Sequence, residues 1–111
     1  MISLLAEPAG PDTVVVRVGK ALDFRNATDF KWLCQQQLAQ GVKKFVLDFT
    51  DTGSLDSTGL GAIFSVYRQV NPRGGQVALA SLSRPVQTVV RLSGSYKVFP
   101  QYASVTDATA A

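Results

Sequence analysis

The sequence predicts a single α/β domain with a mixed, mostly parallel β-sheet covered by helices. Three observations predict it. Apolar strand-type runs alternate with stretches of helical periodicity; apolar residues make up 46% of the chain and charged residues 17%; and 111 residues fit one core without room for a second. A chain of this length buries about two thirds of its surface on folding, which is enough for a core without metals or disulfides.

The first third of the chain predicts two strands and a helix. Residues 2–7 can form a short strand, which the Pro- and Gly-rich turn at 8–11 ends. The run TVVVRV at 13–18 is β-branched and typical of a strand. Apolar residues then recur at helical spacing over 27–40, with Asn26 as the expected N-cap and a glycine at the end.

The remaining elements alternate in the same way. KKFVLDF at 43–49 is a continuous apolar run, suited to the middle of a covered sheet. A strongly amphipathic helix is expected to begin near Ser57 and to end before Asn71-Pro72. QVALASL at 76–82 predicts a strand, and Ser83 is the expected cap of a third helix that stops at Gly94.

YKVF at 96–99 predicts a last short strand. The expected order is therefore β-β-α-β-α-β-α-β, in which the later strands run parallel through right-handed crossovers. The whole chain, 1–111, forms the domain, and residues 103–111 are expected to be a short or frayed C-terminal helix or tail.

Composition excludes most catalytic chemistry. The chain has no histidine, which removes Ser-His, Cys-His and His-metal arrangements together. The single cysteine, Cys34, lies in a helical pattern and is expected to be a buried, reduced thiol. Asp48, Asp51 and Asp56 surround a strand end and could hold a cation such as Mg²⁺, but separate structural roles are favoured. We expect no metal, no cofactor and no enzymatic activity.

The charge distribution and the N-terminal segment indicate which partners and which cellular location to expect. The net charge is +3, yet the Lys and Arg residues are scattered, without a basic run interleaved with aromatic residues, so nucleic-acid binding is not expected. The N-terminal segment MISLLAEPAGPD has no basic region and only a short apolar run, so neither a signal peptide nor a membrane span is expected. These features predict a cytoplasmic protein.

The stretch SLDSTGLGAIF at 54–64 is unusual for a helix start. Asp56 or Ser57 can cap the helix, and that role alone explains one polar residue. Three capping-type residues nevertheless stand together, and Gly59 and Gly61 in the first turns each cost about 1 kcal/mol relative to alanine. The small residues leave a smooth surface that another protein can approach closely.

Residues 47–64, LDFTDTGSLDSTGLGAIF, resemble the signature of STAS domains, specifically the anti-sigma-factor antagonists. The resemblance covers essentially the whole chain and implies the STAS fold. It places the phosphorylated serine at Ser57, with Thr58 as second choice, and the surrounding site at Asp56, Thr58, Gly59, Leu60 and Gly61. RVGKALD at 17–23 resembles the family's strand that leads to an aspartate close to the phosphorylation site, which carries that role to Asp23.

The resemblance also implies a mechanism. The unphosphorylated protein is expected to bind an anti-sigma factor that is itself a GHKL-type serine kinase, which releases the sigma factor. Phosphorylation of Ser57 by that kinase ends the interaction, and a serine phosphatase restores it. A phosphoryl group carries about −1.5 to −2 charges, which a helix N-terminus tolerates. A partner interface beside Asp56 and Asp23 does not tolerate them.

Two matters stay open. Trp32 lies opposite the apolar stripe of its helix, and it is either a partly covered surface residue or a contact for a homodimer or a second partner. The main alternative function is a STAS module that is not phosphorylated and serves as an interaction subunit of a larger signalling or transport assembly. A small metal-dependent nucleotide hydrolase is the alternative from another class.

Overall fold

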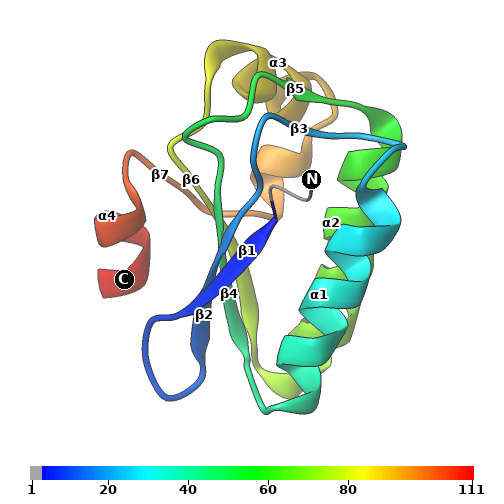
Figure 1. The fold of residues 1–111 in the computed structure, drawn as a ribbon. Coiled ribbons are helices and arrows are strands. Elements are labelled where there is room, and N and C mark those ends of the chain that lie inside the picture. The colour runs from blue at the N-terminus through cyan, green and yellow to red at the C-terminus, as the bar shows by residue number, and fades with distance from the viewer. Residues whose placement is uncertain (1–3) are drawn as a thin grey trace.

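Among the residues that the structure describes, the strands form a five-stranded sheet and a separate two-stranded sheet. In the computed structural model, which describes residues 4–111, the larger sheet has the order β1-β2-β4-β6-β7 (Figure 1). Its strands are β1 (Leu5–Pro8), β2 (Thr13–Arg17), β4 (Lys44–Asp48), β6 (Gln76–Ala80) and β7 (Gln101–Tyr102). Only the β1–β2 pair is antiparallel among these neighbours. The prediction of a mixed, mostly parallel sheet is confirmed.

The helices cover the two faces of the sheet unequally. They are α1 (Ala27–Ala39), α2 (Ser57–Val70), α3 (Arg84–Leu92) and α4 (Val105–Ala110), with 3₁₀ turns η1 (Asn71–Arg73) and η2 (Ser95–Lys97). α1 and α2 lie side by side on one face, and α4 lies on the other (Figure 1). The main core forms between the sheet and the first three helices, from Phe45 and Leu47 of β4, Phe30 of α1, Ile63 of α2 and Val86 of α3.

α4 covers only a small part of the opposite face. Its buried residue Ala108 packs against Val46 and Ala80 of the two central strands. The Ser104 hydroxyl caps the helix by accepting a hydrogen bond from the Asp107 N–H at 3.0 Å. The segment 103–111, expected to be short or frayed, thus contains a capped helix of six residues.

The expected strand at 96–99 was wrong. Residues 95–97 form η2, because Gly94 turns the chain at a φ of +75° and the Phe99 N–H donates to the Ser95 carbonyl. The Phe99 ring enters the core, where its centroid lies 4.8 Å from Phe64 and 5.7 Å from Tyr67. The last strand is instead β7, which pairs with β6.

Two further differences concern element ends. The first strand was expected at 2–7; its residues 2 and 3 lie outside the described part of the chain, and β1 includes Pro8, which occupies an edge strand as proline requires. Sequence analysis also missed β3 (Ala21–Leu22) and β5 (Ser54–Leu55), which pair with each other in parallel. This small sheet brings the residues after position 20 next to the segment before α2.

The expected caps of two helices were only partly correct. Asn26 and Ser83 occupy the N-cap positions of α1 and α3, but neither side chain accepts a hydrogen bond from its helix. The Asn26 side chain accepts from the Asp23 N–H at 3.0 Å and donates to the Ala21 carbonyl at 2.8 Å. The Ser83 hydroxyl donates to the Thr52 carbonyl at 2.6 Å. Both side chains tie separate segments together instead of capping.

Cys34 lies on the buried side of α1, as predicted, and is a free thiol. Burial raises its pKa to about 12, so the reactive thiolate is not populated at neutral pH.

Candidate functional site

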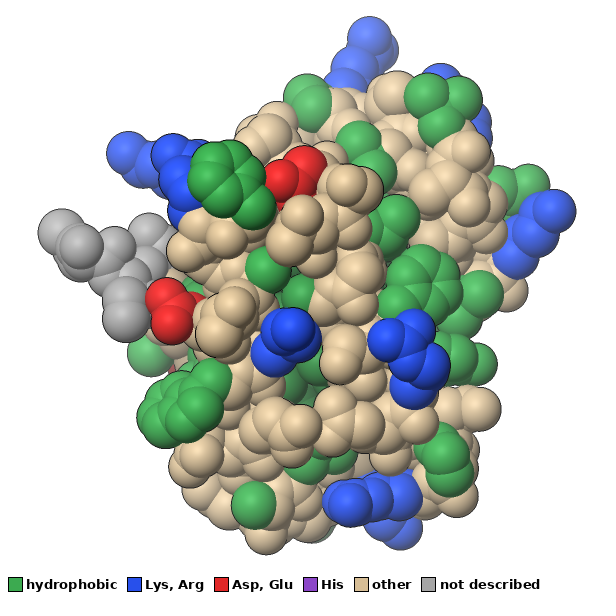
Figure 2. Space-filling view, turned by 90° about the vertical axis from the view of Figure 1, so that its right-hand side faces the viewer, with side chains coloured by type: hydrophobic (Ala, Val, Ile, Leu, Met, Phe, Trp, Pro, Cys, Tyr) green, Lys and Arg blue, Asp and Glu red, His purple; other side chains and the backbone are tan. Residues whose placement is uncertain are grey.

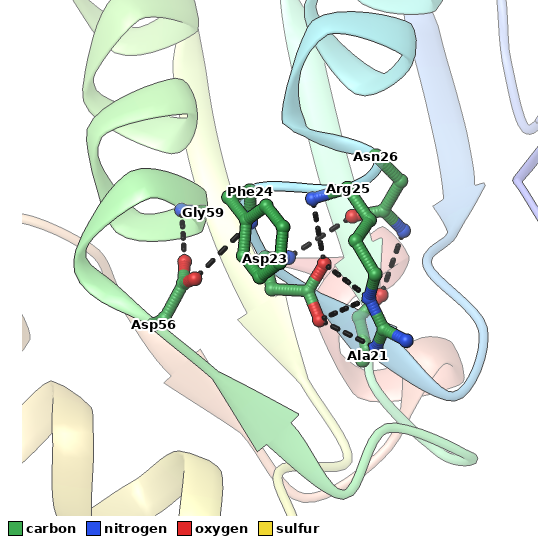
Figure 3. A network of polar contacts seen from close by, with 7 residues as sticks. All are labelled: Ala21, Asp23, Phe24, Arg25, Asn26, Asp56 and Gly59. Atoms are coloured by element: carbon green, nitrogen blue, oxygen red, sulfur yellow. Dashed lines mark hydrogen bonds and ion pairs between the residues drawn. The ribbon is translucent and has the colours of Figure 1, made fainter.

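Asp56 organises the N-terminal end of α2. One carboxylate oxygen, Oδ1, accepts a hydrogen bond from the Gly59 N–H at 2.7 Å and caps the helix. The other, Oδ2, accepts from the Phe24 N–H at 3.1 Å (Figure 3). The prediction that Asp56 or Ser57 starts the helix is confirmed for Asp56, which in addition joins α2 to the loop after β3.

Because Asp56 is the cap, Ser57 becomes the first residue of α2 and its hydroxyl has no structural task. The side chains of Ser57 and Thr58 are both exposed. No hydrogen bond joins the Ser57 hydroxyl to another residue within 4–111. Leu60 is half-buried and Gly61 is exposed, so the first two turns of α2 present small side chains to solvent. An enzyme that modifies Ser57 would meet a free hydroxyl.

The two glycines of this turn have different roles. Gly59 is buried, and a Cβ atom added to it would lie 2.3 Å from the Leu22 carbonyl oxygen of β3. Only glycine permits this close approach of helix and strand. A Cβ atom at Gly61 would meet nothing within 4 Å. Gly59 is therefore required by packing, whereas Gly61 is not.

Asp23 lies at the edge of the same network with only 9% of its surface exposed. Its carboxylate accepts hydrogen bonds from the Arg25 side chain, the shortest at 2.7 Å from a terminal guanidinium nitrogen, and from the Arg25 N–H at 2.9 Å (Figure 3). These bonds, those from the side chain first, hold the pKa of Asp23 below its ordinary value. Asp23 is thus an ionised, paired carboxylate and does not present a free charge.

The structure brings together most of the residues predicted from the sequence. Asp23 lies in the loop after β3 and Asp56 in the segment before α2, and the Phe24 N–H joins the two segments by donating to Asp56. Sequence analysis missed Phe24 and Arg25, which pairs with Asp23. Phe24 had a detectable signal, an aromatic residue in an otherwise polar turn. Trp32 is 63% exposed on α1, so its predicted position away from the core is confirmed, while its role as a contact stays a prediction.

The alternative cation site does not assemble. No group of three or more His, Cys, Asp or Glu side chains that could hold a metal ion occurs among residues 4–111. The Asp48 carboxylate instead accepts hydrogen bonds from the Thr50 N–H at 3.0 Å and the Thr50 hydroxyl at 2.5 Å. None of the helices in the described part of the chain is long and apolar enough to cross a membrane.

Comparison with known proteins assigns the family. The sequence model of the STAS domain matches residues 7–108, and the chain belongs to this family. A Thermotoga maritima protein, provisionally named an anti-sigma factor antagonist, is 31% identical over 98 residues, 87% of each chain. The anti-sigma F factor antagonist of Paenibacillus polymyxa is 27% identical over 94 residues, which span 80% of this chain and 77% of that protein.

Solved structures share the fold. The crystal structure of the provisionally named antagonist from Thermotoga maritima has a TM-score of 0.89 at 27% identity, covering 96% of this chain and 92% of the other. Unphosphorylated SpoIIAA, an anti-sigma factor antagonist, has a TM-score of 0.84 at 22% identity over 96% and 92% of the two chains. The phosphorylated Bacillus SpoIIAA has a TM-score of 0.77 at 21% identity over 96% of each. The last two likenesses concern the fold alone.

Proposed function

We propose that this chain is an anti-sigma factor antagonist whose binding is switched by phosphorylation of Ser57. In its unphosphorylated form it binds an anti-sigma factor that is also a GHKL-type serine kinase, and the sigma factor held by that protein is released. The kinase phosphorylates Ser57, which ends the complex, and a serine phosphatase restores the binding form. The protein acts in the cytoplasm as a binding partner and a substrate, and not as an enzyme.

The observation that carries this proposal is the division of labour at the start of α2. Asp56 caps the helix through the Gly59 N–H, so Ser57 is left exposed and free at the first helical position. A hydroxyl used for capping would be shielded and already hydrogen-bonded. Relatives named as anti-sigma factor antagonists, at 31% and 27% identity, support the same function.

The electrostatics of the site suit a switch that acts on binding and leaves the fold intact. A phosphoryl group on Ser57 would add about −1.5 to −2 charges at the positive end of the α2 dipole. Asp23 is compensated by Arg25, whereas Asp56, next to Ser57, has no ion-pair partner among residues 4–111. Burying the phosphoryl group under a partner would therefore place it beside a second negative charge that no ion pair neutralises, which disfavours the complex.

The test begins with the GHKL-type kinases of the source organism, each purified and incubated with this protein and Mg²⁺-ATP. We expect one of them to transfer a single phosphoryl group to Ser57, as located by mass spectrometry. The Ser57→Ala variant should remain unmodified while it still binds that kinase. Ser57→Asp should weaken the complex at least tenfold, measured by isothermal titration calorimetry with Mg²⁺-ADP.

Other outcomes assign other functions. Phosphate on Thr58 would move the acceptor by one residue and keep the switch. If no kinase modifies or binds the protein, the chain is better described as an interaction subunit that is not phosphorylated. Hydrolysis of Mg²⁺-ATP or Mg²⁺-GTP by the chain alone would support the enzyme alternative and overturn the proposal.

A further inference from the structure

We propose that Phe24 is the anchor through which the kinase that modifies Ser57 recognises this particular chain. The inference rests on the proposed function and deepens it, because it names the contact and the chemistry of the partner. The Phe24 side chain is 73% exposed, although it is a large apolar residue. It lies beside Asp56 in the close-up of the site, with the Asp23–Arg25 pair on its other side (Figure 3).

Backbone hydrogen bonds hold the loop that carries Phe24. The Phe24 N–H donates to Asp56 Oδ2 at 3.1 Å, and the Arg25 N–H donates to Asp23 Oδ1 at 2.9 Å. The Asp23 carbonyl accepts from the N–H groups of Asn26 and Ala27, which joins the loop to α1. Hydrogen bonds on both sides therefore fix the backbone of the loop, from which the ring projects into solvent. With the backbone fixed, binding has to order only the two χ angles of the ring, so an aromatic residue at this position loses little entropy on binding.

The ring is continuous with the site of phosphorylation. Asp56, which holds the Phe24 backbone, is the residue immediately before Ser57. A protein–protein interface covers about 800 Å² on each partner. A kinase active site centred on the Ser57 hydroxyl is expected to cover this loop as well, because Asp56 is bonded to both the Phe24 N–H and the Leu22 carbonyl. Phe24 then lies inside the contact and not at its margin.

The face that carries α1 and α2 favours one defined contact over a broad apolar one. Figure 2 shows apolar side chains on this face as separate patches, divided by polar and basic side chains. A partner that binds here meets separate apolar side chains instead of a continuous hydrophobic surface. Phe24 is an exposed one whose backbone is hydrogen-bonded to the residue before Ser57. The Arg25 side chain is 69% exposed even though it pairs with Asp23. It can donate further hydrogen bonds at the edge of the interface.

The chemistry of the partner surface follows. It presents an apolar pocket that takes up the Phe24 ring, with a carboxylate at the rim opposite Arg25. Asp23 does not contribute a free charge, because Arg25 already satisfies it. The pocket allows this chain to distinguish its own kinase from related kinases. A kinase without the pocket leaves the Phe24 ring exposed, which weakens the complex.

The experiment compares Phe24→Ala with Leu92→Ala in binding to the kinase identified by phosphorylation of Ser57. Leu92 is the matched control: it is 76% exposed and lies at the C-terminal end of α3, whereas the N-cap of that helix, Ser83, is the residue bonded to Thr52 before β5. We expect Phe24→Ala to weaken binding at least tenfold and to raise KM for phosphorylation by a similar factor, with kcat unchanged. Leu92→Ala should stay within twofold of the natural protein, and Phe24→Tyr should restore most of the affinity.

The outcomes separate this inference from the proposed function. If Phe24→Ala binds the kinase and is phosphorylated with a KM within twofold of the natural value, the inference is wrong while phosphorylation of Ser57 stands. Equal losses in Phe24→Ala and Leu92→Ala would also overturn it. If no kinase modifies Ser57, the proposed function fails first. Circular dichroism of both variants confirms that each is folded.

Discussion

The N-terminal ends of α2 and α3 use the same kinds of residue for different purposes. Ser57 is the first residue of α2 and Ser83 occupies the cap position of α3. The Ser83 hydroxyl donates to the Thr52 carbonyl at 2.6 Å, whereas the Ser57 hydroxyl bonds to no other residue of the described chain. A serine at a helix start is therefore structural or available according to whether its hydroxyl has a partner. At α2 the capping hydrogen bond from the Gly59 N–H goes to Asp56, and the Ser57 hydroxyl stays available.

The two ends also differ in how tightly they are packed. α2 begins against the backbone of β3, where Gly59 allows the contact with Leu22, while α3 begins with an exposed Arg84 and Pro85. The α2 end is thus fixed by backbone contacts and hydrogen bonds, and yet it exposes its serine. This combination of a rigid base and a free hydroxyl fits the proposed phosphorylation of Ser57, because an enzyme that binds here meets one backbone conformation.

The largest expected loss of stability comes from disturbing the close packing at the N-terminal end of α2. Gly59→Ala would place a Cβ atom 2.3 Å from the Leu22 carbonyl oxygen, so helix and strand must separate. We expect a loss of about 3 kcal/mol in the free energy of unfolding, measured by urea denaturation followed by circular dichroism. The control is Gly61→Ala, which meets nothing within 4 Å and should stabilise the exposed helix by about 1 kcal/mol. Equal effects at both positions would contradict the close approach.

The next largest loss of stability is expected from removing the N-cap of the same helix. Asp56→Ala loses the hydrogen bonds from the Gly59 and Phe24 N–H groups, and we expect a destabilisation of about 1–2 kcal/mol in urea denaturation. Asp51→Ala, at an exposed position five residues earlier, should change stability by no more than about 0.5 kcal/mol. A similar loss in both variants would show that net charge matters and the cap does not.

The serine comparison can be sharpened by removing each hydroxyl in turn. Ser83→Ala leaves the buried Thr52 carbonyl without its partner, so we expect a loss of about 1 kcal/mol. Ser57→Ala removes an exposed hydroxyl, and its free energy of unfolding should stay within about 0.5 kcal/mol of the natural value. Thermal unfolding by calorimetry measures both. A larger loss for Ser57→Ala would mean that the hydroxyl has a structural role.

How far the sequence predicted these two regions depends on whether a feature is set by residues close together in the sequence or far apart in it. The parallel pairing of the later strands, the three long helices and a cap at Asp56 or Ser57 follow from local periodicity and capping preference, and the structure assigns the cap to Asp56. The hydrogen bond from Ser83 could not be predicted, because its acceptor Thr52 lies 31 residues away. The same holds for the bond that joins Phe24 to Asp56 across 32 residues. Two-residue strands such as β3 and β5 are also too short for any periodicity to register.

The misassigned segment at 96–99 has a related cause. Tyr, Val and Phe favour strands, and the run was apolar enough to suggest one. The tertiary environment decided otherwise, because burying the Phe99 ring between Phe64 and Tyr67 draws the chain into a turn after Gly94. The strand propensity of residues 96–99 was therefore overridden by the burial of the Phe99 side chain.

The smallest expected effect on the free energy of unfolding comes from the ion pair between Asp23 and Arg25, and it depends on pH. Since Arg25 holds the folded-state pKa of Asp23 below its ordinary value, the pair stabilises the protein at pH values above the unfolded pKa of about 3.9. That contribution is lost as the pH falls through the depressed folded-state pKa. We therefore expect Arg25→Gln to be less stable than the natural protein at pH 7, with a difference that shrinks below about pH 4. Urea denaturation at several pH values measures it.

The exposed pair between Arg17 and Glu7, at 3.7 Å, is the matched control, because both of its side chains are more than half exposed and water screens their attraction. Arg17→Gln should differ little from the natural protein at either pH. If Arg25→Gln shows the same small, pH-independent difference, the bidentate pair does not hold the loop. The backbone hydrogen bonds of the loop, from the Phe24 N–H to Asp56 and from the Arg25 N–H to Asp23, would then position Phe24 without the side-chain pair, and Arg25→Gln should bind the kinase as tightly as the natural protein does.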